Sequence, residues 1–244
     1  MATPAVSFPL MLLVRLGGIT VALLVLIWVM HFRGGMALIS EDKNLIFNVH
    51  PTLMLIGFIL LSGEGMLAYK TVPGTKSYKK AAHLVLQAVA FIMAIIGIWA
   101  AYKFHIDKGI DNFYSLHSWL GVACVILFAI QWAVGFATFW YPGGSRNARA
   151  TLLPWHAFLG LYIYGLAVAT AETGLLEKLT FLQGSNIIAR YSSEAILVNC
   201  LGLVLALLSG CVILSTISPT NGKRDVLKQG DVLRTTDRLT GHTS

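Results

Sequence analysis

Hydrophobic residues in this chain come in six long runs, and the polar residues are concentrated between them. The runs cover roughly residues 10–31, 47–69, 81–102, 113–139, 152–171 and 195–217. A helix needs about 20 apolar residues to cross the hydrocarbon core of a bilayer, so each run is long enough to span it. Barrel strands would instead alternate over about ten residues. The pattern predicts an all-α integral membrane protein, a bundle of six transmembrane helices.

Composition supports a membrane protein with little sequence left for a soluble domain. Hydrophobic residues make up 56% of the chain and charged residues 12%, whereas soluble domains carry about 25% charged residues. The first run lacks a small-residue cleavage pattern, so it is interpreted as a helix and not as a signal peptide. We expect residues 1–219 to form one six-helix transmembrane domain and residues 220–244 to form a disordered basic cytoplasmic tail.

The distribution of lysine and arginine predicts the orientation of the bundle. With the C-terminal tail included, eleven of them lie on the same side as the two termini and six on the other side, whose loops are richer in acidic residues. Positive residues accumulate on the cytoplasmic side of membrane proteins, so both termini are expected in the cytoplasm. The net charge of +7 is therefore explained by topology, and nucleic acid is not an expected partner.

Four histidines lie near the start of four consecutive runs: His50, His83, His117 and His156. Because consecutive helices run in opposite directions, His50 and His117 should lie near the non-cytoplasmic surface and His83 with His156 near the cytoplasmic one. Facing helices of a bundle commonly build cofactor sites, and two histidines at one depth suit the axial positions of a haem iron. We predict two non-covalent haem b groups in a core formed by the second to fifth helices.

Nearby residues refine this prediction. The chain has no Cys-x-x-Cys-His motif, which would attach a haem covalently. Gly121 and Gly160 each follow a histidine by four residues, hence on the same helical face, and are expected to leave room for a flat macrocycle. Pro51 follows His50 and is favoured in the first turn of a helix. Any one of the histidines taken alone could equally well hydrogen-bond a neighbouring helix.

Several short stretches around these histidines are distinctive, namely Asn48-Val49-His50-Pro51, Leu67-Ala68-Tyr69-Lys70, Lys79-Lys80-Ala81-Ala82-His83 and Ser115-Leu116-His117-Ser118-Trp119. In them the chain resembles the cytochrome b561 family, the ascorbate-reducible transmembrane dihaem cytochromes, and most of all its plant vacuolar-type members. Many animal members carry arginine where this chain has Lys70. The resemblance covers essentially all six helices.

The resemblance implies a transmembrane ascorbate-dependent oxidoreductase, a monodehydroascorbate or ferric reductase. Cytosolic ascorbate would give one electron to the cytoplasmic haem, and the non-cytoplasmic haem would pass it to monodehydroascorbate or a ferric chelate. The resemblance also implies a vacuolar (tonoplast) or other endomembrane location. A homodimer is implied as well, with the first and sixth helices as the expected interface.

Basic residues flank the cytoplasmic pair. Lys76, Lys79 and Lys80 lie one or two turns before His83 on its helical face, and Arg149 stands in a similar relation to His156. Ascorbate is an anion at neutral pH, so these four residues are predicted to bind it. The positive-inside rule alone would also place lysines here.

On the other side, aromatic and polar residues flank His117. Phe104, His105, Asn112 and Tyr114 are predicted to form the non-cytoplasmic substrate site. His105 can exchange a proton near neutral pH, which matters because monodehydroascorbate takes up a proton when it is reduced.

Glu64 is a carboxylate well inside a predicted span. Burying it is expensive, so it is a candidate for tuning a haem or relaying a proton. Two other functions stay open: a proton or ion transporter with a membrane histidine relay, and a haem-bearing membrane subunit of a quinone-linked complex. The transporter explains Glu64 but neither the two histidine pairs nor the lack of interrupted helices in corresponding halves.

Overall fold

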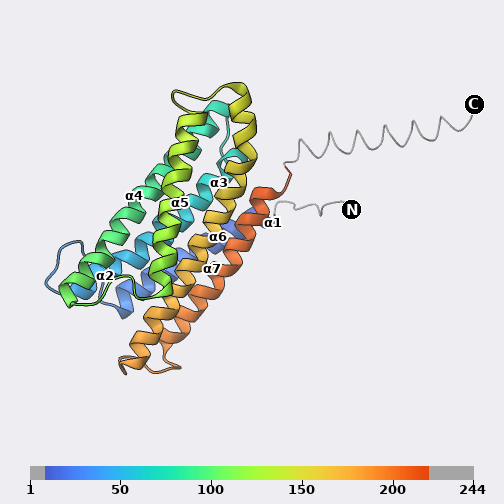
Figure 1. Cartoon of the computed structure of the whole chain (residues 1–244). Coiled ribbons are helices and arrows are strands. Elements are labelled where there is room, and N and C mark those ends of the chain that lie inside the picture. The colour runs from blue at the N-terminus through green and yellow to red at the C-terminus, as the bar shows by residue number, and fades with distance from the viewer. Residues whose placement is uncertain (1–8, 220–244) are drawn as a thin grey trace, which may run out of the picture.

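The computed structural model describes residues 9–219, which form a bundle of helices (Figure 1). Six helical segments are long and apolar enough to cross a membrane, so the predicted fold class is confirmed. The expected tail, residues 220–244, lies outside the described residues. The elements are α1 (Pro9–Ile27) with a π-helical turn (Trp28–Phe32), α2 (Lys43–Thr52) with a π-helical segment (Leu53–Leu60) and α3 (Leu61–Thr71), then α4 (Lys76–Lys108), α5 (Leu116–Phe139), α6 (Arg146–Gly184) and α7 (Ser193–Ile217).

Several helices are longer than the apolar runs because they continue beyond the hydrocarbon core on capped polar turns. Thr75 caps α4 and Ser145 caps α6, each accepting a hydrogen bond from a backbone N–H of the first turn. Such a cap satisfies a donor that has no partner inside the helix. Hydropathy detects only the part of a helix that lies in lipid. The predicted run 152–171 is therefore much shorter than α6.

The second span differs from the prediction at Pro51. The helix begins at Lys43, with Asp42 as its cap, so Pro51 lies inside it and not in its first turn. Proline has no N–H to donate to the helical ladder, and the helix widens into the π-helical segment Leu53–Leu60 directly afterwards. Widened turns of this kind are frequent at functional sites, and this one begins three residues after His50.

The helices pack mainly as pairs: α1 on α7, α5 on α6, and α4 on both α2 and α3. Their shared interior is apolar, with the rings of Phe58 and Phe128 in contact at its centre, 5.0 Å apart. Many large apolar side chains are exposed on the outside of the bundle. An apolar surface of this extent marks contact with a membrane.

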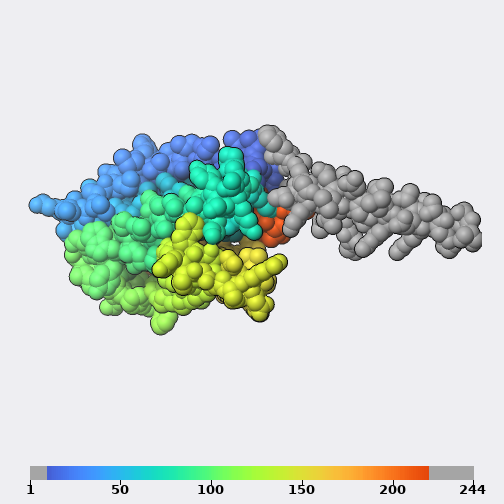
Figure 2. All heavy atoms as spheres, turned by 90° about the horizontal axis from the view of Figure 1, so that it is seen from above, coloured from blue at the N-terminus to red at the C-terminus, as the bar shows by residue number. Residues whose placement is uncertain are grey.

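The connections gather at the two ends of the bundle. We call the end with residues 9 and 219 and the loops 72–75 and 140–145 the terminal end, and the end with the loops 33–42, 109–115 and 185–192 the opposite end. Figure 2 looks onto the terminal end, where the start of α4 (teal) lies beside the turn that leads into α6 (yellow-green). Lys80 links these segments by donating a hydrogen bond to the Phe139 carbonyl oxygen at 3.1 Å.

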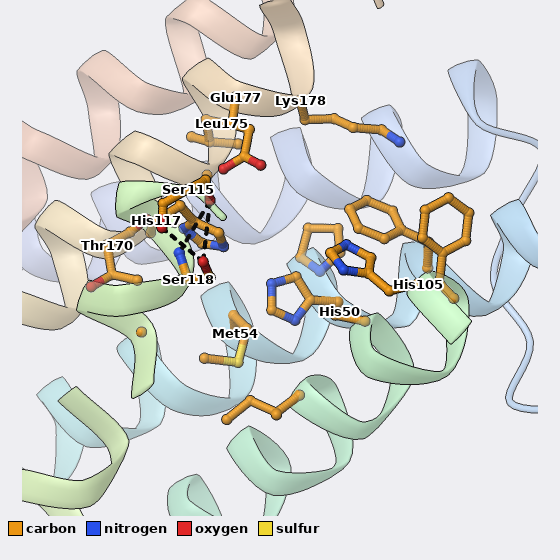
Figure 3. A pocket seen from close by; sticks show the side chains of 18 of the residues that line it. His50, Met54, His105, Ser115, His117, Ser118, Thr170, Leu175, Glu177 and Lys178 are labelled. Atoms are coloured by element: carbon orange, nitrogen blue, oxygen red, sulfur yellow. Dashed lines mark hydrogen bonds between the residues drawn. The ribbon is translucent and has the colours of Figure 1, made fainter. Parts of the chain in front are cut away.

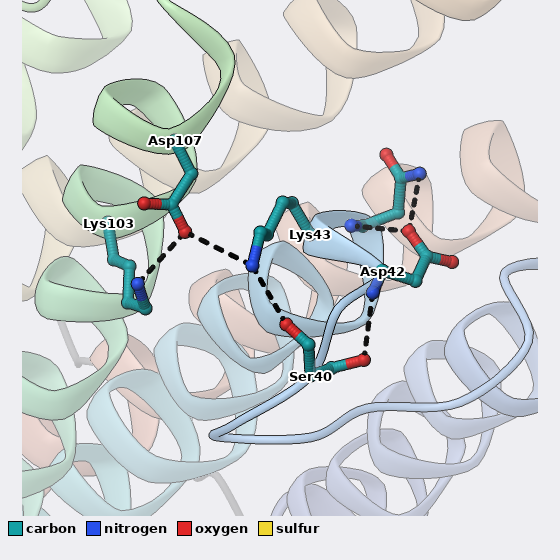
Figure 4. Close-up of polar contacts among 6 residues, drawn as sticks. Ser40, Asp42, Lys43, Lys103 and Asp107 are labelled. Carbon is teal, nitrogen blue, oxygen red and sulfur yellow. Dashed lines mark hydrogen bonds and ion pairs between the residues drawn. The ribbon is translucent and has the colours of Figure 1, made fainter.

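Polar side chains fasten the loop 33–42 at the opposite end (Figure 4). Asp107 accepts a hydrogen bond from Lys103 at 2.9 Å, and Lys43 lies 3.8 Å from the same carboxylate. Lys43 also donates to the Ser40 carbonyl oxygen at 3.1 Å. Exposed ion pairs add only about 0–1 kcal/mol each. Their main effect here is to hold the loop against the end of α4.

Lys70 caps the last turn of α7. Its ammonium donates hydrogen bonds to the carbonyl oxygens of Ser215, Thr216 and Ser218. The last carbonyls of a helix have no intrahelical partners and carry partial negative charge, so a lysine there is favourable. Lys70 therefore ties α3 to α7.

Candidate functional site

The four histidines form two facing pairs, one at each end of the bundle. At the opposite end the rings of His50 (α2) and His117 (α5) have centroids 6.0 Å apart and planes at 84°. At the terminal end the rings of His83 (α4) and His156 (α6) have centroids 6.2 Å apart and planes at 71°. The structure thus brings together the residues that alternate along the chain. Their role as iron ligands stays a prediction.

A neighbouring helix orients three of the four rings. In each case the Nδ1 atom forms a hydrogen bond with a backbone carbonyl oxygen. The partner of His50 is Gly97, at 3.0 Å, and the partner of His83 is Gly65, at 2.8 Å. The partner of His117 is Thr170, at 2.8 Å. A carbonyl oxygen only accepts, so Nδ1 carries the proton and Nε2 keeps its lone pair. This is how proteins usually prepare a histidine to bind a metal.

Two glycines make room for the histidine rings. A Cβ atom at Gly174 of α6 would lie 2.6 Å from Cε1 of His117, and one at Gly135 of α5 would lie 2.9 Å from Cε1 of His156. Any side chain would therefore displace the ring. Both glycines lie on the helix that faces the histidine, not on its own helix. Same-helix spacing pointed to Gly121 and Gly160, and Gly121 lines the cavity described below.

The spacing of each pair fits a single metal ion held between the two rings. A metal–imidazole bond is about 2.0–2.1 Å long and the nitrogen lies about 1.1 Å from the ring centre, so two such rings would have centroids about 6 Å apart. Among residues 9–219, no three His, Cys, Asp or Glu side chains are grouped closely enough to hold a bare metal ion. Two opposed histidines suit an iron whose porphyrin supplies its other ligands.

A cavity of about 710 Å³ contains the pair at the opposite end (Figure 3). Its volume is within the range of about 300–1,000 Å³ usual for cofactor sites. The wall is largely apolar, with Met54, Leu55, Phe58 and Val125 beside the two histidines. The two histidines, the space left by Gly174 and the apolar wall together fit a haem b.

All four residues predicted to form the non-cytoplasmic substrate site lie on the wall of this cavity: Phe104, His105, Asn112 and Tyr114. His105 and Tyr114 stack, with ring centroids 6.5 Å apart. Tyr114 also donates a hydrogen bond to Glu177 at 3.0 Å. Partial burial and the Glu177 carboxylate raise the pKa of Tyr114 to about 12, so its hydroxyl stays protonated at physiological pH.

Two of the four predicted ascorbate-binding residues are held close to the histidines of the terminal end. Lys80 donates to the carbonyl oxygen of Phe139, whose ring lies 5.3 Å from that of His156. Lys79 donates at 3.3 Å to the carbonyl oxygen of Tyr69, whose ring lies 6.0 Å from that of His83. The other two, Lys76 and Arg149, are exposed.

Glu64 has a partner that the sequence did not identify. It forms an ion pair with Arg15 of α1. Both side chains are partly exposed on the bundle surface. The pair connects α1 to α3, which gives Glu64 a structural role besides the tuning or relay role predicted for it.

Known proteins resemble this chain over most of its length. The model of the family described as "Eukaryotic cytochrome b561" matches residues 49–182. "Transmembrane ascorbate ferrireductase 2" of Arabidopsis thaliana is 60% identical over 94% of this chain and 100% of its own length. "Probable ascorbate-specific transmembrane electron transporter 2" of Oryza sativa subsp. japonica is 48% identical over 83% of this chain and 86% of its own. "Transmembrane ascorbate-dependent reductase CYB561" of Sus scrofa is 38% identical over 90% and 85%.

Proposed function

The chain belongs to the eukaryotic cytochrome b561 family, and we propose that it is a transmembrane ascorbate ferrireductase with one haem b at each histidine pair. The observation that carries this proposal is the facing pair at each end of the bundle. The names of its relatives describe ascorbate-dependent reductases and electron transporters. They favour this function over an ion transporter or a quinone-linked subunit.

Each histidine pair has a defined part in this function. Haem iron, when bound, alternates between its ferric and ferrous states and so takes up and releases one electron at a time. His50 and His117 would hold one haem, and His83 and His156 the other. Donation from Nδ1 to a carbonyl fixes the tautomer and raises the basicity of Nε2. Around His50 and His117 the largely apolar wall would help to set the reduction potential, together with these hydrogen bonds.

We assign the terminal end to the cytoplasm. The starts of α4 and α6 there carry Lys76, Lys79, Lys80, Arg146 and Arg149. With Lys70 and the five lysines and arginines after residue 219, this side has eleven basic residues, against six on the opposite side. This is the asymmetry that the positive-inside rule describes. His83 and His156 are then the cytoplasmic pair, and ascorbate is the cytosolic donor.

The donor site lies over the cytoplasmic pair. Lys79 and Lys80 are anchored to the backbone of two residues, Tyr69 and Phe139, whose rings contact the histidines. An ascorbate anion bound by these ammonium groups would rest close to the cofactor edge, and the exposed Lys76 and Arg149 would attract it from solution. We assign all four to ascorbate binding.

The acceptor site is the mouth of the cavity at the opposite end. Phe104 and Asn112 would shape it, His105 would supply a proton, and Tyr114, held by its hydrogen bond to Glu177, would line the site beside the His105 ring. These groups suit monodehydroascorbate, which takes up a proton with its electron, as well as a ferric chelate. An endomembrane location such as the tonoplast, and a homodimer formed through α1 and α7, complete the proposal.

A visible spectrum of the purified protein tests the proposed function. Ascorbate should produce the bands of reduced haem b, and a ferric chelate added afterwards should remove them. A protein without haem bands would contradict the proposal. So would haem bands that dithionite reduces and ascorbate does not.

Replacing Lys80 with alanine should slow haem reduction by ascorbate by about 10- to 150-fold, because one charge-assisted contact contributes about 1.5–3 kcal/mol. Reduction by dithionite, which does not use the site, should keep its rate. The rates are measured by stopped-flow absorbance. Lys108→Ala, at the other end of α4, is the matched control and should match the parent protein. Equal ascorbate rates for all three proteins would contradict a role for Lys80 in the donor site.

A further inference from the structure

We propose that Lys178 of α6 forms an ion pair with a haem propionate at the opposite end of the bundle. Lys178 would then be a positioning residue, which holds the haem in register with His50 and His117 and raises its reduction potential. This inference rests on the proposed function, which assigns a haem b to that pair.

The first observation is the face of α6 on which Lys178 lies. Thr170, Gly174 and Lys178 follow one another at intervals of four residues, so they share one helical face. Thr170 accepts the hydrogen bond of His117, and Gly174 makes room for the His117 ring. Lys178 is one turn nearer the opposite end on the face that positions His117.

The second observation is where the Lys178 ammonium lies. It lines the cavity of the histidine pair, and Figure 3 shows its side chain extending toward the side where His105 lies. Its Nζ atom is 4.1 Å from the ring centroid of Phe47 and 5.8 Å from that of Phe104. These cation–π contacts fix the position of the ammonium, but each is weak compared with an ion pair to a carboxylate.

The third observation is that Lys178 has neither an ion pair nor a hydrogen bond among residues 9–219. The other basic residue on the cavity wall, Arg33, is paired with Glu194, which also accepts a hydrogen bond from Trp28 at 2.8 Å. The carboxylate of Glu177, which is next to Lys178 in the sequence, accepts a hydrogen bond from the Tyr114 hydroxyl. Asp42, which also lines the cavity, accepts hydrogen bonds from Asn44. Each of these carboxylates therefore already has another partner.

An ammonium in an apolar membrane cavity is costly without a counterion. Haem b carries two propionate carboxylates, so it supplies an anion to the same cavity that its iron would occupy. A carboxylate beside Lys178 would neutralise it and gain charge-assisted hydrogen bonds. Because the ferric cofactor has one more positive charge than the ferrous, a cation beside it favours the ferrous form.

A redox titration of the full-length holoprotein tests the proposal. Lys178→Gln should shift the reduction equilibrium of one haem toward the ferric form by about tenfold, which is 59 mV for a one-electron couple, and leave the other haem unchanged. Lys178→Arg should keep the parent value. Lys103→Gln is the matched control at the same end, since Lys103 is paired with Asp107 outside the cavity, and it should leave both haems unchanged.

A second variant does not depend on the size of that shift. Lys178→Glu places a carboxylate beside the propionate and should lower the haem content from two to about one per chain. Two unchanged potentials in Lys178→Gln, together with full haem content in Lys178→Glu, would overturn the proposal. A raised KM for ferric chelate with unchanged potentials would also overturn it, because Lys178 would then bind the acceptor. A parent protein without haem would instead refute the proposed function.

Discussion

Replacing His83 with alanine should remove the haem of the terminal end and abolish reduction by ascorbate. The ring of His83 faces His156 and is oriented by the Gly65 carbonyl oxygen, so alanine leaves one possible axial ligand in place of two. Loss of a residue that merely orients a ligand costs up to about 100-fold in affinity or activity, and loss of the ligand should exceed that. Haem content should fall from two to one per chain, and the rate of ascorbate reduction should fall more than about 100-fold.

The matched control is His31→Ala. This histidine also lies in a transmembrane helix, but its ring packs against Phe32, 4.8 Å away, and not against another histidine. We expect His31→Ala to keep both haems and the parent rate. Pyridine haemochrome analysis per chain and stopped-flow absorbance give the two quantities. A His83→Ala protein with two haems would show that His83 is not a ligand.

Replacing Gly174 with leucine should remove the other haem. A Cβ atom at this position would lie 2.6 Å from Cε1 and 2.9 Å from Nδ1 of His117, closer than real side chains approach. The ring would have to move, lose its hydrogen bond to Thr170 and turn away from His50. We expect about one haem per chain, with the remaining haem still reduced by ascorbate, because the cytoplasmic pair and the donor site are unchanged.

Gly165→Leu is the control for this substitution. Gly165 lies in the same helix, and no heavy atom lies within 4 Å of a Cβ built there. Both variants exchange glycine for leucine within α6, so they share any effect on helix propensity. Only the variant at Gly174 should lose haem. Equal haem content in the two proteins would mean that the His117 ring does not need the space at Gly174.

The arrangement of the four histidines could be predicted from the sequence because it depends only on helix order. Apolar runs locate the spans, consecutive spans reverse direction, and His50, His83, His117 and His156 then sort into two pairs. The partners of the rings could not be predicted in this way. The carbonyl oxygens of Gly97 and Thr170 have no signature in the sequence, and their use depends on how each helix is rotated against its neighbour.

Helix length was the other quantity that hydropathy could not give. The predicted run ended at residue 171, so Gly174 and Lys178 counted as part of a loop. In the structure they continue the face of α6 that contacts His117. The partner of Glu64 was missed for a different reason. Its ion pair with Arg15 depends on how the first and second spans are rotated against each other, which the sequence does not show.

The haem content of double histidine variants tests the central claim most directly. If each haem is held by one facing pair, then His50→Ala/His117→Ala should keep one haem per chain, because both substitutions destroy the same site. His50→Ala/His83→Ala should keep none, because it destroys both sites. Loss of both haems in the first variant, or one haem retained in the second, would contradict the two-pair account.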